Sequence, residues 1–280
     1  MNWPTWDQAA VLALVCGTVA FILRRSRPTR VREFVMPAAQ EIALVASLYA
    51  IWRLARTLPL AKTEGAIERA RQLDRLQHWL HFPTELSLQH FVVQHDWLAR
   101  STNAYYAIVH VPALIVFLVW LFVRHRDAYP RWRNCLAIVT AFCLIIRFIR
   151  VAPPRFLADL GYVDLATRFG LSLYGPVGTG VSDQFAAMPS IHVAWAAVVS
   201  FGIVATSTSR WRWLFMLHLV LTMAVVSATG NHWWLDGIVA IVLLGLALLI
   251  DRSVRQAAGR RRAGHRDDDV HHEASVGLRH

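Results

Sequence analysis

Long apolar runs alternate with short polar segments along most of the chain. The runs are 9–23, 34–54, 105–123, 135–151, 191–206, 214–228 and 237–250. A membrane-spanning helix needs about 20 mostly apolar residues, and runs of this kind are typical of such helices. The first run is short for a span, but Trp3 and Trp6 before it can serve as interfacial anchors. We therefore predict an all-α fold, a polytopic bundle of membrane helices.

The polar segments divide the chain into three parts. Residues 1–33 contain an N-terminal transmembrane helix and a basic cytoplasmic loop, and residues 34–250 form the main membrane domain. Residues 251–280 are polar, basic and without periodicity, which predicts a disordered cytoplasmic tail. The residues before the first run carry no positive charge, unlike a cleaved signal peptide. We expect the first helix to be retained, with its N-terminus outside.

The basic residues cluster between the apolar runs. The formal net charge is +11, and Lys62 is the only lysine. A basic total can indicate a nucleic-acid partner, but the positive-inside rule explains Arg-rich loops between membrane helices more simply. We therefore expect no nucleic-acid partner. Placing these loops in the cytoplasm brings three polar stretches, 147–155, 189–192 and 231–236, together on the outer side.

A long polar segment, 56–103, separates the second and third runs. In its first half apolar residues recur at helical spacing among charges of both signs, which predicts an amphipathic helix lying flat on the outer membrane face. His78, His81, His90 and His95 lie here, but none of them repeats a metal-site spacing. The cysteines all lie inside apolar runs and form no disulfide framework. The sequence indicates neither a metal nor a cofactor.

Polar residues inside the runs need a partner, because an unpaired polar group in lipid is costly. Gln40 and Glu41 fall within the second run, and we expect them to face protein or water. His110 falls within the third run. Two interpretations of His110 stay open: a functional residue, or a structural hydrogen bond to a neighbouring helix.

The stretch 231–236 carries the first candidate chemistry. His232 and Asp236 are four residues apart, so they share one face if the following helix begins near Trp233. An imidazole in contact with a carboxylate can act as a nucleophile with an orienting partner. The alternative is an interfacial histidine and a helix-start aspartate beside an aromatic belt.

The stretch 188–192 opens the fifth run. Pro189 suits the first turn of a helix, and Ser190 can offer its hydroxyl and its backbone N–H to an anion at the helix N-terminus. His192, one turn further on, could then reach a phosphoester oxygen. The alternative is an ordinary helix cap with a solvated histidine.

The stretch 147–155 contributes Arg147, Arg150 and Arg155, whose guanidinium groups suit phosphate oxygens. Two prolines restrict the backbone just before Arg155. Arg150 could instead extend to lipid headgroups. Arg147 lies deeper, where an arginine is expected to be paired or functional.

Together these residues are recognisable. Pro-Ser-x-His at 189–192, followed by Asn-His-x-x-x-Asp at 231–236, resembles the type 2 phosphatidic acid phosphatase superfamily. The Ala-Pro-Pro-Arg run at 152–155 and Ala-Thr-Gly-Asn-His at 228–232 resemble its inositol phosphotransferase branch, which includes inositol phosphorylceramide synthase. The resemblance covers roughly 105–250.

This resemblance implies a six-helix catalytic core, to which the first helix would be an addition, and a metal-independent double displacement. The family's nucleophilic histidine falls on His232, its orienting aspartate on Asp236, and its leaving-group acid on His192. Ser190 and Arg155 fall on phosphate-binding positions.

Two departures from the family pattern matter. The first family motif normally begins with a lysine, for which Arg147 or Arg150 must substitute here, and the sequence does not distinguish them. The phosphatase branch carries an arginine several residues before the nucleophilic histidine, where this chain has 225–228, Val-Val-Ser-Ala. This absence favours the transferase branch over a simple phosphatase.

We therefore expect a phosphotransferase or phosphatase acting on a lipid phosphate or phospholipid headgroup through a phosphohistidine. The site would lie at the extracytoplasmic face of the plasma membrane, with an alcohol such as inositol as a possible acceptor. A lipid or solute transporter is the main alternative, but it would favour repeated halves and broken helices, and neither is visible. A catalytically inactive lipid-binding scaffold is a third interpretation, which the intact His232, Asp236 and His192 disfavour.

Overall fold

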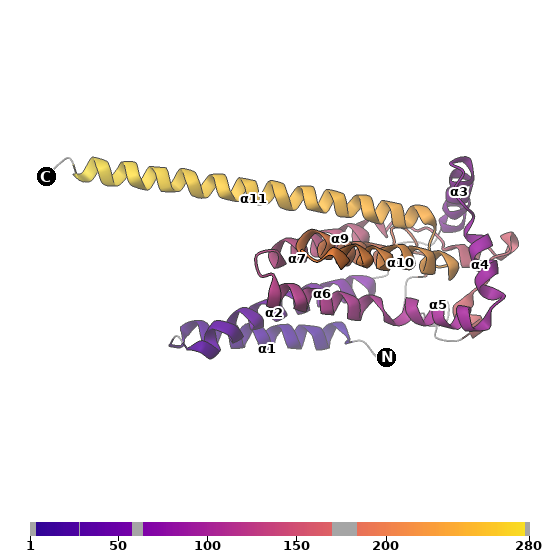
Figure 1. Ribbon diagram of the computed structural model, residues 1–280, viewed down its shortest axis with the longest axis horizontal. Helices are drawn as coiled ribbons and strands as arrows, with labels where there is room; N and C mark the ends of the chain where they lie inside the picture. Colours follow the sequence, from indigo (N-terminus) through magenta and orange to yellow (C-terminus); the bar gives the residue numbers. More distant parts are fainter. Residues whose placement is uncertain (1–3, 28, 58–63, 170–183, 278–280) are drawn as a thin grey trace.

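The computed structural model describes residues 4–27, 29–57, 64–169 and 184–277, which are helical throughout most of their length (Figure 1). The first helices are α1 (Trp6–Arg25), α2 (Arg30–Thr57), α3 (Ala66–Trp79), α4 (Glu85–Val93), α5 (Asp96–Ile108), α6 (His110–Arg124) and α7 (Tyr129–Ile146). Then follow η1 (Pro154–Phe156), η2 (Ala158–Leu160), α8 (Leu165–Phe169), α9 (Ile191–Thr206), η3 (Arg210–Phe215), α10 (Met216–Ala228) and α11 (Trp234–Gly277). The prediction of an all-α fold is confirmed.

The centre of the bundle is α9, which packs against α6, α7, α10 and α11. Its sequence is apolar on every face, the composition of a helix that is buried on all sides. Every residue from Val193 to Ser200 is accordingly buried. The main apolar core surrounds this helix and draws side chains from all four neighbours, including Phe117 and Leu244.

The membrane character of the chain follows from helix length and hydropathy. Within the part that the structure describes, four helices are long and apolar enough to cross a bilayer: Trp6–Arg25, Arg32–Ala55, Arg210–Ala228 and Trp234–Arg260. Helices α5 and α6 would make a fifth span if taken together, although they are bent by 47°. Each of the seven apolar runs lies mainly in helix, whereas the full number of crossings stays a prediction.

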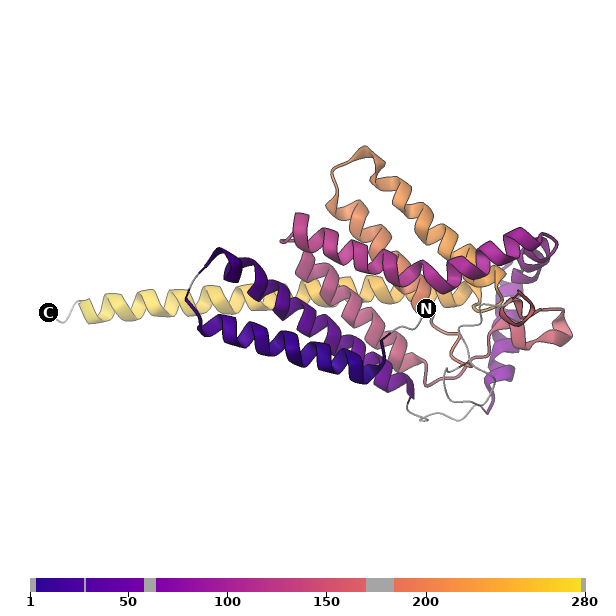
Figure 2. The ribbon, with the colours of Figure 1, turned by 90° about the horizontal axis from the view of Figure 1, so that it is seen from below.

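Helices α1 and α2 form a hairpin along one flank of the bundle (Figures 1 and 2). Glu41 of α2 meets Arg133 of α7, and both carboxylate oxygens lie 2.6 Å from the same guanidinium nitrogen. The expectation that Glu41 faces protein is thus confirmed. Gln40 is exposed on the surface of the hairpin, so its expected contact with protein or water stays a prediction.

Helices α3, α4 and α5 lie at one end of the bundle, and α3 and α4 contact the first turn of α11 (Figure 1). Ala66 and Ala70 of α3 are buried in a second apolar cluster with Leu157 and Trp233. The predicted amphipathic helix therefore packs its small residues on the loops at this end, while Trp79 is 73% exposed. The Gly- and Pro-rich loop before α9 lies mostly outside the described residues.

The last helix differs from the sequence-based expectation. We predicted disorder for 251–280, but α11 continues to Gly277 and projects beyond the bundle (Figure 1). A preceding membrane helix supplies the nucleus that an isolated segment lacks, and alanine and arginine extend a helix readily. Arg255 also pairs with Asp251 one turn earlier, at 2.6 Å, which supports the exit from the bundle.

Close packing of α6 on α9 generates the first testable prediction. A Cβ atom at Gly202 would lie 2.2 Å from the ring of Phe117, which is buried. Gly202→Leu should therefore overpack this contact and cost about 1–3 kcal/mol or more. The measurement is the midpoint of thermal unfolding in detergent.

Gly245→Leu is the matched control, because no atom lies within 4 Å of a Cβ built at Gly245. This substitution should leave the midpoint unchanged or raise it, since leucine favours helix over glycine. Equal midpoints for the two variants would contradict the packing described here.

Candidate functional site

The three polar stretches meet at the end of the bundle that carries α3 and α4. The backbone N–H of Arg155 donates to the carbonyl of Gly230 at 3.0 Å, which joins the first stretch to the third. The N–H of Ser190 donates to the carbonyl of Asp236 at 3.2 Å, which joins the second to the third. The sequence-based expectation that these stretches lie together is confirmed, whereas their chemical roles stay predictions.

His232 is buried at the centre of this arrangement, and its Nδ1 faces two oxygens. The carbonyl oxygen of Ala187 lies 2.6 Å away and a carboxylate oxygen of Asp236 lies 3.4 Å away. A carbonyl only accepts hydrogen bonds, so Nδ1 must carry the proton in the neutral ring. The lone pair is then on Nε2, the nitrogen that a nucleophilic imidazole would use.

Asp236 reaches His232 by a different route from the one the sequence suggested. Helix α11 begins at Trp234, so His232 precedes the helix and the two residues do not share a helical face. Instead, the fully buried carboxylate turns back towards the helix start and accepts the N–H of Trp233 at 2.8 Å. Its other oxygen has no hydrogen-bond partner among the described residues.

Ser190 is the N-cap of α9, so Pro189 precedes the helix and does not lie in its first turn, contrary to our expectation. Its hydroxyl oxygen accepts the N–H of Val193 at 3.4 Å, and its own N–H is already donated to Asp236. The backbone N–H is therefore not available to an anion, contrary to our expectation, although the hydroxyl proton is. His192 follows in the first turn, with its ring centroid 5.7 Å from that of His232.

Arg155 is buried in η1 and held on the third stretch. Its guanidinium donates to the side-chain oxygen of Asn231 and lies 3.9 Å from Asp164. Gly230 makes this approach possible, because it has a φ of +68° and a Cβ there would lie 3.3 Å from the Cβ of Arg155. Two requirements, left-handed backbone and close contact, thus select glycine at this position.

Arg147 and Arg150 are both buried where the chain leaves α7. The backbone just after them is fixed on both sides. Val151 exchanges hydrogen bonds with Phe185 and Ala187, the residue whose carbonyl contacts His232. Trp233 donates its indole N–H to the carbonyl of Ala152 at 3.0 Å. This segment is therefore part of the frame that holds His232.

Sequence reasoning missed two residues that support the site, Gln77 of α3 and Glu85 of α4. Glu85 accepts the N–H of Trp234 at 2.8 Å, and Gln77 accepts the N–H of Leu235 at 3.0 Å. Gln77 also donates to Glu85 at 2.8 Å. These contacts satisfy N–H groups that the first turn of a helix leaves without intrahelical partners. No local pattern reveals them, because they are about 150 residues away from α11 in sequence.

Burial also perturbs Glu85. Removing this carboxylate from water raises its pKa above the ordinary glutamate value, because burial disfavours the charged form. The N–H groups of Trp234 and of Gln77 oppose this effect.

His110 lies beside His192, with ring centroids 4.9 Å apart. Neither of its ring nitrogens has a hydrogen-bond partner among the residues described, so the interpretation as a structural hydrogen bond to a neighbouring helix is wrong. Tyr105 and His218 continue the cluster, since the Tyr105 hydroxyl lies 2.8 Å from the His218 ring nitrogen. His232, His192 and His110 thus form a row of imidazoles that runs from the site into the bundle.

No group of three or more His, Cys, Asp or Glu side chains in the described ranges is arranged to hold a metal ion. At the site, imidazoles and a buried carboxylate face one another, and buried guanidinium groups lie on the adjoining stretch 147–155. Together they suit nucleophilic and acid–base chemistry on an anionic substrate.

Comparison with known families agrees with this chemistry. The model of the PAP2 superfamily, the type 2 phosphatidic acid phosphatases, matches residues 71–250, well over half of the chain. Searches of curated proteins and of solved structures found no match. The chain belongs to the PAP2 superfamily. Its members are generally phosphatases or phosphotransferases, which supports an enzyme of this kind.

The hydrogen bond from the backbone N–H of Trp234 to the carboxylate of Glu85 generates the second prediction. Glu85→Ala leaves the partly buried N–H of Trp234 without its acceptor and should cost about 1–3 kcal/mol of stability. Glu85→Gln keeps an oxygen at the same position and is the matched control. The measurement is the thermal midpoint of each variant in detergent across a pH series.

The pH dependence has a definite sign. Because burial raises the pKa of Glu85, the contribution of the native residue is complete below the unfolded pKa of about 4.5. It is lost as pH rises through the higher pKa of the folded state. Wild type should therefore lose stability relative to Glu85→Gln as pH rises, and a constant difference would contradict the assignment.

Proposed function

We propose that this member of the PAP2 superfamily is an integral-membrane enzyme that transfers a phosphate or phospho-headgroup from a lipid through a phosphohistidine on His232. The observation that carries the proposal is the orientation of His232. Its Nδ1 faces Ala187 and Asp236, which leaves the lone pair of Nε2 for attack. His192 lies beside His232, where it can protonate the leaving group and then deprotonate the acceptor.

The first step forms a bond from Nε2 of His232 to phosphorus and breaks the bond from phosphorus to the leaving oxygen. The imidazole becomes positively charged, and Asp236 stabilises this charge from the Nδ1 side. His192 gives a proton to the leaving alkoxide and becomes neutral.

The second step returns the enzyme to its starting state. Neutral His192 takes a proton from the incoming water or alcohol, whose oxygen then attacks phosphorus. The bond from phosphorus to Nε2 of His232 breaks, which leaves that ring neutral and His192 protonated for another cycle.

Cationic groups supply the electrostatic stabilisation. Arg155, fixed by Asn231, and the buried Arg147 and Arg150 are suited to the equatorial phosphate oxygens. The hydroxyl of Ser190 can donate one more hydrogen bond. Buried guanidinium groups act strongly on such charge because the surroundings have a low dielectric constant.

The location of the site follows from charge distribution. If the Arg-rich loops are cytoplasmic, the end of the bundle that carries His232 faces outward. We therefore place the reaction at the extracytoplasmic face of the plasma membrane, where outer-leaflet lipids can reach it.

The acceptor distinguishes the two branches of the family. The segment 225–228, where phosphatases carry an arginine, is buried and holds only Val, Ser and Ala. Together with the sequence resemblance to the inositol phosphotransferase branch, this favours an alcohol such as inositol over water.

The third prediction separates the roles of the two histidines. His232→Ala should abolish both the phosphoenzyme and turnover, because the nucleophile is lost. His192→Ala should retain labelling by an aryl phosphate, whose leaving group departs without protonation, and then stall. Its turnover of lipid substrate should fall by roughly 10²–10⁴-fold, the usual contribution of a general acid–base.

The measurement is acid-labile, base-stable labelling of each purified variant with radiolabelled aryl phosphate. Thermal midpoints equal to that of wild type serve as the folding control. Labelling that persists in His232→Ala and vanishes in His192→Ala would reverse the two roles.

The fourth prediction concerns the acceptor. With a radiolabelled lipid phosphate or phospholipid, addition of inositol should convert part of the product from free phosphate or free headgroup to an inositol-containing product. The experiment follows both products across a panel of alcohols. Rapid phosphate release that no alcohol diverts would make the enzyme a lipid phosphate phosphatase.

A further inference from the structure

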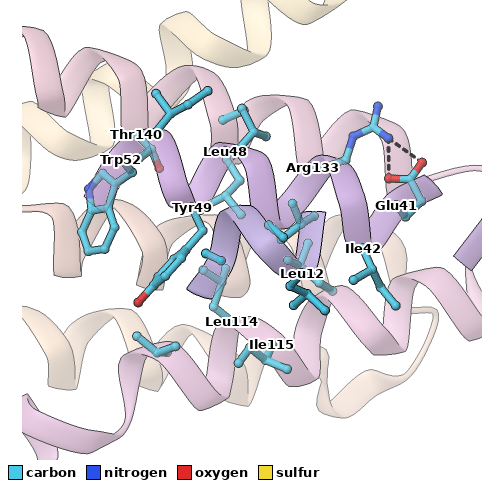
Figure 3. A pocket seen from close by; sticks show the side chains of 18 of the residues that line it. Leu12, Glu41, Ile42, Leu48, Tyr49, Trp52, Leu114, Ile115, Arg133 and Thr140 are labelled. Atoms are coloured by element: carbon cyan, nitrogen blue, oxygen red, sulfur yellow. Dashed lines mark hydrogen bonds and ion pairs between the residues drawn. The ribbon is translucent and has the colours of Figure 1, made fainter. Parts of the chain in front are cut away.

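A large cavity lies between the α1–α2 hairpin and the rest of the bundle (Figure 3). Its volume is about 760 Å³, and its walls come from α1, α2, α6 and α7, with Trp195 of α9. Characteristic lining residues are Leu12, Ile42, Leu114, Ile115 and Ala137. A cavity of this size is within the range that holds a small-molecule ligand.

The walls of the cavity suit a hydrocarbon ligand. Aliphatic and aromatic side chains make up most of the lining. Polar side chains of the lining are largely used within the protein. Arg133 pairs with Glu41 (Figure 3), and Trp195 donates to Thr140 at 3.0 Å. Binding a polar ligand here would cost free energy, because little is left to replace its hydrogen bonds to water.

The depth of the cavity matches one leaflet of a membrane. On α6 the lining extends from Val111 to Phe122, and on α2 from Ala38 to Trp52. At 1.5 Å per residue these stretches correspond to roughly 16 and 21 Å. One leaflet of the hydrocarbon core is about 15 Å thick, so an acyl chain inserted from one face would fill this depth.

One end of the cavity lies next to the candidate site. Trp195 lines the cavity and is three residues from His192 on α9, which is about one helical turn. Val111 lines it as well and directly follows His110. The Glu41–Arg133 pair lines the opposite end (Figure 3).

We propose that this cavity binds one acyl chain of the lipid substrate while the phosphate of that lipid lies at His232. The inference rests on the proposed function and adds to it a requirement for a long-chain lipid. Helices α1 and α2, which form one wall, precede the residues that match the PAP2 superfamily. One wall of the cavity therefore lies outside the residues that match the family.

The test fills the cavity and compares substrates that differ only in their chains. Ala137→Phe and Ala141→Phe place a ring in the cavity from α7, and Ala141 is the more exposed of the two positions. Ala205→Phe is the matched control, because Ala205 is exposed on α9 and does not line the cavity. The substrates are dipalmitoyl phosphatidic acid, dioctanoyl phosphatidic acid and an aryl phosphate.

Wild type and Ala205→Phe should prefer the dipalmitoyl lipid over the dioctanoyl lipid. The filled variants should lose about tenfold or more in kcat/KM for the dipalmitoyl lipid, the equivalent of about two buried methylenes. They should turn over the aryl phosphate as wild type does, which shows that they are folded and that the site is intact. An unchanged chain-length preference in both filled variants would overturn the proposal.

Photolabelling tests the occupant without relying on turnover. Phosphatidic acid with a diazirine in one acyl chain should label peptides of α6 and α7 in wild type and in Ala205→Phe, and label them less in Ala137→Phe. A fatty alcohol with the same diazirine-bearing chain but no phosphate should label them weakly. Equal labelling by both probes would identify a site for bulk lipid and overturn the proposal, whereas failure of every substrate with intact phosphatidic acid labelling would overturn the proposed function alone.

Discussion

The backbone at the start of α11 must find hydrogen-bond acceptors away from water, and the candidate site is built from the groups that provide them. Asp236 accepts the N–H of Trp233, Glu85 that of Trp234, and Gln77 that of Leu235. An unsatisfied N–H in a buried position costs free energy comparable to a lost hydrogen bond. Satisfying this one turn therefore ties α3, α4 and α11 together and leaves Asp236 beside His232.

The first turn of α11 and the residues just before it also position the other segments of the site, through backbone hydrogen bonds. The carbonyl of Asp236 accepts the N–H of Ser190, which sets the start of α9 and so the position of His192. Gly230, just before His232, accepts the N–H of Arg155. The start of α9, the segment that carries Arg155 and the segment that precedes α11 are thus joined by backbone hydrogen bonds. Such bonds are more rigid than contacts between long side chains. A rigid backbone keeps the catalytic groups in position before the substrate binds, which electrostatic stabilisation of a transition state requires.

The bundle has a central part and a flanking part. Helix α9 is surrounded by four other helices and carries His192 into the core, whereas α1 and α2 pack less completely and leave a cavity beside it. A soluble protein would lose stability to an apolar void of this size. In a bilayer, an acyl chain can occupy the space, so loose packing of the hairpin is compatible with a stable protein and useful to an enzyme that acts on lipids.

The sequence by itself determined the elements and the residue types of the site. Apolar runs of membrane length predicted the helices, and Pro-Ser-x-His with Asn-His-x-x-x-Asp identified the superfamily and the candidate residues His192, His232 and Asp236. Only the tertiary structure decided how they are held. Each of the contacts that hold them joins segments far apart in the chain, so no local pattern predicts it. These contacts are that of His232 with the carbonyl of Ala187, those of Glu85 and Gln77 with the start of α11, and that of His110 with His192. For residues 251–277 the polar composition predicted disorder, whereas the structure has a helix there. This segment continues a stable helix, so it does not bear the cost of nucleation, an effect that composition alone does not predict.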